Sequence, residues 1–122
     1  MMSKSILIIE YSQDVRTFLQ HDLQHNEGYE VLAVGDIKSG YEKLMLKRQS
    51  YDVILLGLLR TQGLELIRIL KEHDEHLLKS IIAMSASDMA LLEARRLGVR
   101  HLIRKPFDLQ AFYNLISSSH TF

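Results

Sequence analysis

The chain has 122 residues, of which 47% are hydrophobic and 25% charged, a composition typical of one soluble globular domain. Fifteen basic residues balance fifteen acidic ones, so binding of nucleic acid through bulk positive charge is not expected. The lack of cysteine excludes disulfides, thiolate zinc sites and cysteine nucleophiles. No apolar run approaches the roughly 20 residues that span a bilayer. The N-terminus does not resemble a secretory signal, so a cytoplasmic protein without a membrane segment is expected.

Five short segments predict β-strands. Residues 6–9, 53–56 and 81–84 are continuous apolar runs, residues 102–103 form a shorter one, and residues 29–34 alternate between apolar and polar. Continuous runs are typical of strands covered on both faces, as in a parallel sheet. The alternating segment indicates a strand at the edge of that sheet.

Apolar residues at helical intervals separate these strands. The first set is Val15, Phe18, Leu19 and Leu23, and the last is Leu109, Phe112, Tyr113 and Ile116. Residues suited to begin the helices are Ser12, Asp36, Ser87 and Asp108, and residues suited to end them are Gly28 and Gly98. Five repeated βα units predict an α/β fold in which a five-stranded parallel sheet lies between two layers of helices.

The chain shows no sign of division into several domains. It has no internal repeat, low-complexity tract or shift in composition, so we expect a single domain over residues 1–122 with an ordered core over about residues 5–116. The run Ser117-Ser118-Ser119 predicts that residues 117–122 form a tail or the start of a linker.

Ligands of open parallel sheets bind beyond the carboxyl ends of the strands. The residues at these places are Glu10, Tyr11, Gly57, Ser85 and Lys105. Neither a G-x-G-x-x-G nor a P-loop motif occurs, which removes the main support for nucleotide binding. We therefore look for function at these five positions.

Several short motifs occur in a particular order and spacing. They are Ile6-Leu7-Ile8-Ile9-Glu10 with Arg16 six residues on, Gly28-Tyr29-Glu30-Val31, Tyr51-Asp52-Val53-Ile54-Leu55-Leu56, Gly63-Leu64-Glu65-Leu66, Met84-Ser85-Ala86 and Arg104-Lys105-Pro106-Phe107-Asp108. Together they resemble the receiver domain of two-component response regulators, over about residues 5–116. The resemblance implies a flavodoxin-like, CheY-like (βα)5 three-layer sandwich.

In that family, two acidic residues after the first strand help to hold Mg²⁺, and an Asp after the third strand accepts a phosphoryl group. A Ser or Thr after the fourth strand and the Lys of a Lys-Pro motif contact the phosphoryl oxygens. Glu10 matches the first acidic residue, but Tyr11 stands at the second and Gly57 at the phospho-acceptor position. Ser85 and Lys105 match their counterparts.

No alignment restores the missing acceptor. The loop after the third strand is about two residues short, but no carboxylate occurs between Asp52 and Glu65, and Asp52 precedes the strand. Glycine offers no nucleophile. One carboxylate makes a weak magnesium site. We therefore expect a degenerate receiver, or pseudo-receiver, that is not an enzyme, has no metal site or cofactor, and binds Mg²⁺ weakly or not at all.

The resemblance also implies roles for neighbouring residues. Leu102 occupies the place of the aromatic switch residue of the family, and the bond before Pro106 is expected to be cis. We expect Lys105 to pair with Glu10 and close the empty pocket; the alternative is a lysine that points into solvent.

Residues 88–105 contain five Lys and Arg residues but only two acidic ones. The candidate interaction residues are Arg95, Arg96, Arg100 and Arg104. The resemblance places them on the face of helix 4, strand 5 and helix 5, which implies docking to a protein partner or a homodimer. Nucleic-acid binding by this domain alone is disfavoured, because the patch lacks aromatic residues. An ordinary solvated helix face remains the other interpretation.

These observations favour an atypical receiver that acts in two-component-type signalling through protein–protein interaction, without phosphorylation. One alternative is a phosphorelay receiver with an unorthodox acceptor, such as Glu10 or Ser85. Another is a small-molecule sensor that uses the vacated acidic pocket. In a longer chain, residues 117–122 would lead into a C-terminal output domain.

Overall fold

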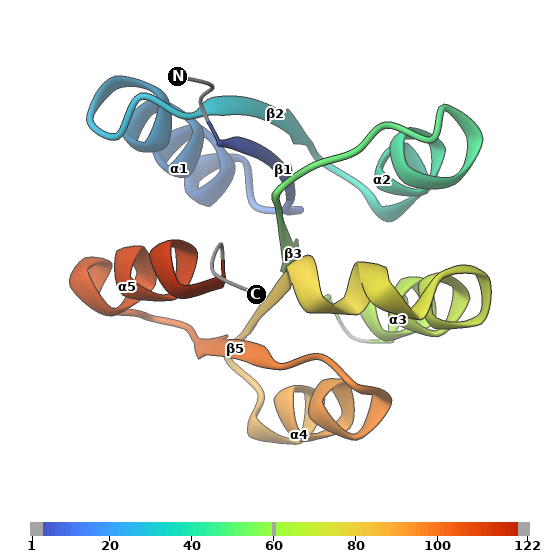
Figure 1. The fold of residues 1–122 in the computed structure, drawn as a ribbon. Helices are drawn as coiled ribbons and strands as arrows, with labels where there is room; N and C mark the ends of the chain where they lie inside the picture. The colour runs from blue at the N-terminus through green and yellow to red at the C-terminus, as the bar shows by residue number, and fades with distance from the viewer. Residues whose placement is uncertain (1–3, 60, 120–122) are drawn as a thin grey trace.

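Five parallel strands form the centre of the structure, a computed structural model that describes residues 4–59 and 61–119 (Figure 1). The strands are β1 (Ser5–Ile9), β2 (Glu30–Val34), β3 (Val53–Gly57), β4 (Ile81–Ser85) and β5 (His101–Arg104). They lie in the order β2-β1-β3-β4-β5. The predicted α/β fold of five βα units around a parallel sheet is confirmed.

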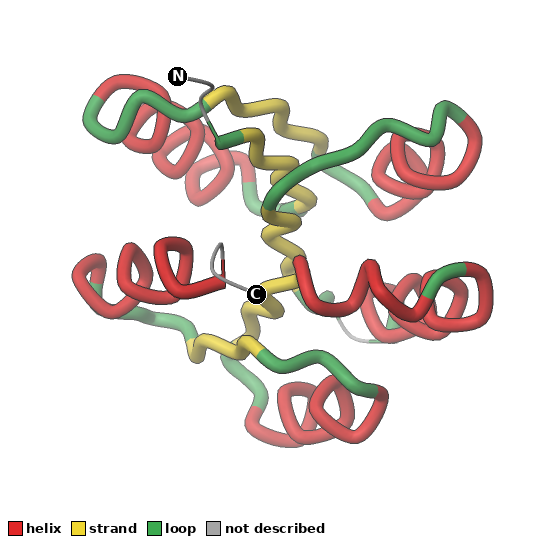
Figure 2. Tube along the Cα trace, in the orientation of Figure 1, coloured by secondary structure: helices red, strands yellow, loops and turns green. Residues whose placement is uncertain are grey.

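Helices cover both faces of this sheet (Figures 1 and 2). Helices α1 (Gln13–His25) and α5 (Leu109–Ser119) cover one face, and α2 (Ile37–Tyr41), α3 (Gln62–His73) and α4 (Asp88–Leu97) cover the other. A π-helical turn, η1 (Glu42–Leu46), continues α2, and a 3₁₀ turn, η2 (Glu75–Ser80), follows α3.

Each sheet face has its own hydrophobic cluster, which explains the continuous apolar runs. In β1, Leu7 and Ile9 belong to the cluster under α3, whereas Ile6 and Ile8 belong to the cluster that includes Phe112 of α5. Successive side chains of a strand point to opposite faces, so a strand covered on both sides must be apolar at every position.

Most helix boundaries follow the predicted capping residues. The side chains of Ser12, Asp36 and Ser87 accept hydrogen bonds from backbone N–H groups in the first turns of α1, α2 and α4. Gly98 has a φ of 115° and ends α4, as predicted. The prediction for Gly28 was wrong: α1 ends at His25, and Gly28, with a φ of 71°, lies in the turn that leads to β2.

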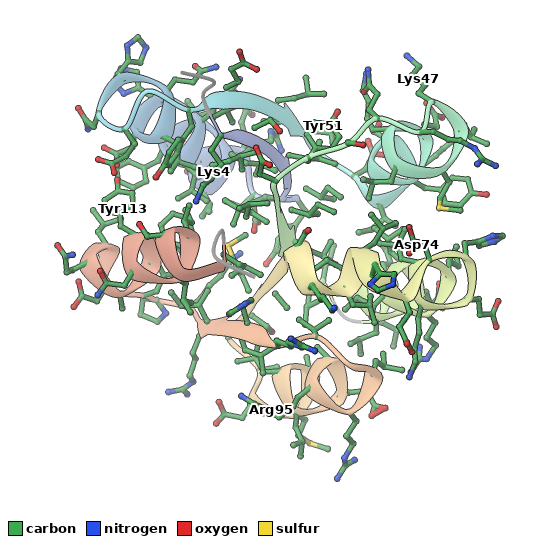
Figure 3. The ribbon with its side chains drawn as sticks, viewed as in Figure 1. Lys4, Lys47, Tyr51, Asp74, Arg95 and Tyr113 are labelled. Carbon is green, nitrogen blue, oxygen red and sulfur yellow. The ribbon has the colours of Figure 1, made fainter. Side chains whose placement is uncertain are left out.

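Helix α5 forms the last part of the chain that the structure describes. We expected a tail from residue 117, but α5 continues to Ser119, and residues 120–122 lie outside the described part of the chain. Ile116 is fully buried and anchors the last turns of the helix. Its carbonyl accepts a hydrogen bond from Lys4 Nζ at 2.8 Å (Figure 3 labels Lys4). None of the described helices is long and apolar enough to cross a membrane.

Candidate functional site

Glu10 and Gly57 lie next to each other at the carboxyl edge of the sheet. Strands β1 and β3 are neighbours, with Ile9 paired to Leu56, so the residues that follow these two are brought together. The strand order reverses direction between β1 and β3, since β2 lies on the other side of β1. Ligand sites of open α/β sheets form at such a switch point.

Glu10 is a charged residue with a fully buried side chain, which is 0% exposed. Its Oε2 accepts a hydrogen bond from the Ser12 backbone N–H at 2.9 Å. Its backbone N–H donates to Val34 O at 3.1 Å, and its carbonyl accepts from Arg16 Nη1 at 2.8 Å. These contacts from β2 and α1 fix the residue in the turn after β1, with its carboxylate directed inward.

The Glu10 carboxylate lies directly over Gly57. A Cβ atom built on Gly57 would overlap Glu10 Oε1, and it would lie 3.1 Å from Glu10 Cδ and 3.4 Å from Ile9 O. The space that a side chain at position 57 needs is therefore occupied by the carboxylate of position 10. Glycine fits at position 57 because the Glu10 carboxylate lies so close to its backbone, and not because the backbone has an unusual conformation.

Lys105, the residue that directly follows β5, completes this arrangement. Its Nζ lies 2.6 Å from Glu10 Oε1, and its side chain is 18% exposed, so the expected Lys105–Glu10 ion pair is present. The Lys105 backbone N–H donates to Ser85 O at 2.9 Å, and the Lys105–Pro106 bond is cis, as the resemblance implied. Lys105 Nζ also lies 5.2 Å from the centroid of the Tyr11 ring, which is half exposed and flanks the pair.

Ser85 is buried at the end of β4. Its hydroxyl accepts a hydrogen bond from the Ser87 backbone N–H at 3.0 Å, in the turn that leads to α4. Its carbonyl receives Lys105 N–H. These bonds make Ser85 part of the turn structure around the Lys105 backbone.

The arrangement does not fit a resident magnesium ion. Mg²⁺ needs carboxylate oxygens to replace part of its water shell. Both Glu10 oxygens already accept hydrogen bonds, one from Lys105 and one from Ser12. Tyr11 and Gly57 carry no carboxylate. Within residues 4–59 and 61–119, no three or more His, Asp or Glu side chains are grouped to hold a metal ion.

Leu102, the expected switch position, and Asp52, which the sequence already excluded as an acceptor, both lie away from this pair. Leu102 is half-buried in β5 and packs against the hydrophobic cluster under α3 and α4. Asp52 lies at the opposite end of β3, where its Oδ2 accepts from the Ser5 backbone N–H at 2.8 Å. Asp52 is therefore far from Gly57 along the strand and does not contribute to the site.

The four candidate interaction residues are exposed on α4, on the turn after it and at the end of β5. Arg104 Nε lies 3.1 Å from Asp88 Oδ1, and Arg96 Nη1 lies 4.0 Å from Glu93 Oε2. Exposed pairs of this kind contribute about 0–1 kcal/mol. All four arginines are exposed, and two of them pair with acidic residues of the same segment.

Two features of the structure were not predicted from the sequence. One is the hydrogen bond from the Ser12 backbone N–H to the Glu10 carboxylate. The sequence feature that could have predicted it is an acidic residue two positions before a helix N-cap. The other is the pair of exposed apolar residues on α4, Met89 and Leu92, which are 82% and 47% exposed. Their signal is their spacing, one helical turn apart and off the face of the buried Ala94.

Comparison with known proteins identifies the family. Residues 6–117 match the family model described as the response regulator receiver domain. The chain belongs to this family. It is similar to response regulator ArlR of Staphylococcus saprophyticus, with 33% identity over 109 residues that cover 86% of this chain and 47% of that protein.

A second curated relative matches over a similar range, and a solved structure shares the fold. Transcriptional regulatory protein CrdR of Helicobacter pylori is 30% identical over 114 residues, covering 88% of this chain and 51% of that protein. This receiver domain therefore spans about half the length of the curated relatives it matches. The crystal structure of chemotaxis protein CheY4 of Vibrio cholerae shares the fold, with a TM-score of 0.80 at 20% identity and coverage of 97% of this chain and 99% of that one.

Proposed function

We propose that this receiver domain acts in two-component-type signalling by protein–protein contact and without phosphorylation. The observation that carries the proposal is the Glu10–Lys105 ion pair seated over Gly57. In the family, the lysine of the Lys-Pro motif contacts a phosphoryl group on an acceptor Asp. Here that lysine has an internal carboxylate as its partner, and position 57 has no side chain to accept a phosphoryl group.

The same pair supports weak or absent Mg²⁺ binding. To take Glu10 as a ligand, the ion would have to displace Lys105 and the Ser12 N–H from a fully buried carboxylate. Separation of a buried ion pair leaves an uncompensated charge, which costs several kcal/mol. One carboxylate does not offset this cost for an ion that gives up its water reluctantly.

The proposed interaction face is the surface of α4, β5 and α5 that carries Arg95, Arg96, Arg100 and Arg104. Its exposed arginines and the neighbouring Met89 and Leu92 support this assignment, because basic and apolar groups together are typical of partner-binding surfaces. The curated relatives are about twice as long as this chain, which supports a C-terminal output domain in any longer form of the protein.

The test is exposure to a small-molecule phosphodonor with Mg²⁺, followed by measurement of the intact mass. A phosphorylatable receiver treated in the same way is the positive control. We expect no covalent phosphoryl adduct on this chain. A stoichiometric mass increase that Ser85→Ala or Glu10→Gln abolishes would instead establish an unorthodox acceptor.

A titration with Mg²⁺ and beryllofluoride, followed by NMR, tests the same pocket without covalent chemistry. We expect no shifts that cluster at Glu10, Gly57, Ser85 and Lys105. Clustered shifts at these four residues would contradict the proposal, because they would show that the pocket still receives a phosphoryl mimic.

A small-molecule sensor at this pocket receives less support. The cavity beside Gly57 has a volume of about 100 Å³ and is partly lined by Tyr11, Asp36 and Leu59. Small-molecule sites are usually about 300–1,000 Å³. A metabolite that raises the melting temperature of the wild type, but not of a Tyr11→Trp variant that narrows this cavity, would support the sensor instead.

A further inference from the structure

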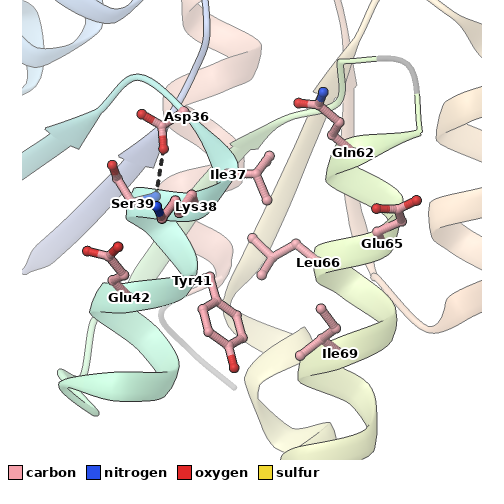
Figure 4. A pocket seen from close by; sticks show the side chains of 10 residues that line it. All are labelled: Asp36, Ile37, Lys38, Ser39, Tyr41, Glu42, Gln62, Glu65, Leu66 and Ile69. Carbon is pink, nitrogen blue, oxygen red and sulfur yellow. Dashed lines mark hydrogen bonds between the residues drawn. The ribbon is translucent and has the colours of Figure 1, made fainter.

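A second, larger depression lies between α2 and α3, on the opposite sheet face from α1 and α5 (Figure 4). Its volume is about 800 Å³. Apolar side chains line it from both helices: Ile37 and Tyr41 come from α2, and Leu66 and Ile69 come from α3. We call this depression the α2–α3 groove.

The α2–α3 groove has an acidic rim. Three carboxylates, those of Asp36, Glu42 and Glu65, line it together with a single lysine, Lys38. The Ser39 backbone N–H donates to Asp36 Oδ1 at 2.7 Å and lowers the pKa of that carboxyl group, so Asp36 is an anion at neutral pH. A helix that presents apolar residues next to basic ones therefore matches the groove in both polarity and charge.

Helix α4 of the same chain presents such a surface. Met89 and Leu92 are exposed and lie one turn apart, and Arg95 and Arg96 follow in the next turn. Figure 3 shows Arg95 at the outer side of α4. The chain as a whole has no net charge, so two copies do not repel each other at long range.

We propose that α4 of one copy docks into the α2–α3 groove of a second copy. Met89 and Leu92 enter between the apolar side chains of α2 and α3, and Arg95 and Arg96 meet Glu42 and Glu65. This proposal rests on the proposed function, because it names a second copy of the chain as the partner that binds α4 in the proposed interaction face.

This contact joins two different surfaces of the chain. Such a heterologous contact leaves an unused α4 on one copy and an unused groove on the other, so further copies add unless the rotation closes a ring. An isologous contact between two α4 helices would stop at a dimer and would not involve the α2–α3 groove. The two arrangements therefore predict different masses and different effects of substitution.

Sedimentation velocity of the wild-type chain, from micromolar to millimolar concentration, is the first measurement. We expect the weight-average mass to rise beyond that of a dimer at low ionic strength. Added salt should lower it, because the arginine–carboxylate contacts at the groove rim are exposed and screened. A wild-type chain that stays monomeric at millimolar concentration and low salt overturns the proposal.

Two variants that neutralise charge separate the surfaces. The groove variant is Glu42→Gln/Glu65→Gln, and the α4 variant is Arg95→Gln/Arg96→Gln. Each removes the charged partners from one side, and we expect each to weaken association roughly tenfold. Matched controls remove the same number of charges of the same sign at exposed residues outside both surfaces: Glu27→Gln/Glu30→Gln and Lys47→Gln/Lys79→Gln. Both controls should associate like the wild type.

Mixing the two variants gives the decisive result. The groove variant keeps an intact α4, and the α4 variant keeps an intact groove, so the mixture should form a one-to-one complex and little that is larger. Undiminished association of the groove variant would show that the groove carboxylates take no part in the contact and would overturn the proposal. The phosphodonor test, run on the same samples, reports on the proposed function separately, because it does not depend on association.

Discussion

Lys105 stabilises a buried carboxylate, and this makes its removal costly. Glu10 has no exposed surface, so Lys105→Met leaves its charge without the ammonium partner that lies 2.6 Å away. Breaking a fully buried pair costs about 3–5 kcal/mol, and the partial exposure of Lys105 lowers our expectation to about 2 kcal/mol. Urea unfolding, followed by circular dichroism, measures this loss.

The matched control for that experiment is Lys79→Met, which removes an exposed lysine from η2. It should leave the free energy of unfolding almost unchanged. Adding Glu10→Gln to Lys105→Met should recover part of the loss, because the unpaired charge is gone. Equal stability of wild type and Lys105→Met would show that the pair contributes nothing.

Gly57 is predicted to tolerate no larger residue while Glu10 is present. In Gly57→Ala, the new Cβ overlaps Glu10 Oε1, and overpacking of this kind costs about 1–3 kcal/mol. Chemical denaturation of Gly57→Ala, Glu10→Ala and the double variant forms a double-mutant cycle. We expect a coupling energy of at least about 1 kcal/mol, with Gly57→Ala nearly neutral in the Glu10→Ala background. Additive effects would contradict the proposed close approach.

At the residue scale, sequence patterns predicted the partners better than the positions of their atoms. The Glu10–Lys105 pair could be predicted, because both residues follow strands and carry opposite charge. The placement of the carboxylate over Gly57 could not, because it depends on the register of β1 against β3 and on the turn to Ser12. Neither is encoded in residue spacing alone.

Some elements of the fold follow from the local sequence, whereas others depend on contacts with distant residues. The strands could be predicted because two covered faces require continuous apolar runs. The short α2 and its π-helical continuation η1 could not be predicted from the sequence. The structure shows a contact between α2 and a distant strand. Gly40 is buried in α2, and a Cβ at this position would overlap Ile9 Cδ1 of β1. Packing against a distant strand thus decides how closely this helix lies on the sheet.

The start of α4 offers a test at the scale of one element. The Ser87 hydroxyl accepts a hydrogen bond from Ala90 N–H at 3.2 Å and satisfies one otherwise unpaired donor of the first turn. Ser87→Ala should lower the free energy of unfolding by about 1 kcal/mol. Ser50→Ala, in an exposed loop, is the control and should have little effect. An unchanged urea midpoint for Ser87→Ala would rule out a stabilising cap.

The stability of the whole molecule should depend on pH through His101. Burial in β5, and secondarily the nearby Arg100, lower the pKa of His101 below its ordinary value. The unfolded chain therefore binds a proton at higher pH than the folded one. The contribution of neutral His101 is complete above about pH 6.5 and is lost as the pH falls from there through the folded-state pKa. Unfolding free energies measured across this range should decrease toward acid.

His101→Gln should flatten that dependence, whereas His25→Gln, at an exposed position of α1, should leave it intact. A wild-type stability that rises toward acid over the same range would contradict the lowered pKa. Urea titrations at matched ionic strength keep the exposed charge pairs from contributing a separate effect.

For the whole molecule, the fold was more predictable than its surfaces. Five alternating βα units leave few topologies, because crossovers are right-handed and parallel strands need covering helices. The α2–α3 groove was not predictable, because it is defined by the space between two helices and by a turn that departs from α-helical geometry. The charges along the sequence predicted the basic segment at residues 88–105. They did not predict the acidic α2–α3 groove, whose carboxylates come from separate elements.

The contact between Glu10 and Gly57 also constrains how this chain can change over evolutionary time. A mutation that introduces an aspartate at position 57 meets a site already filled by another carboxylate, with a single lysine to serve both. A side chain at position 57 therefore requires the Glu10 carboxylate to move or to be replaced. A variant library that randomises positions 10 and 57 together should therefore return residues at the two positions that depend on each other, with large residues at 57 accompanied by small ones at 10.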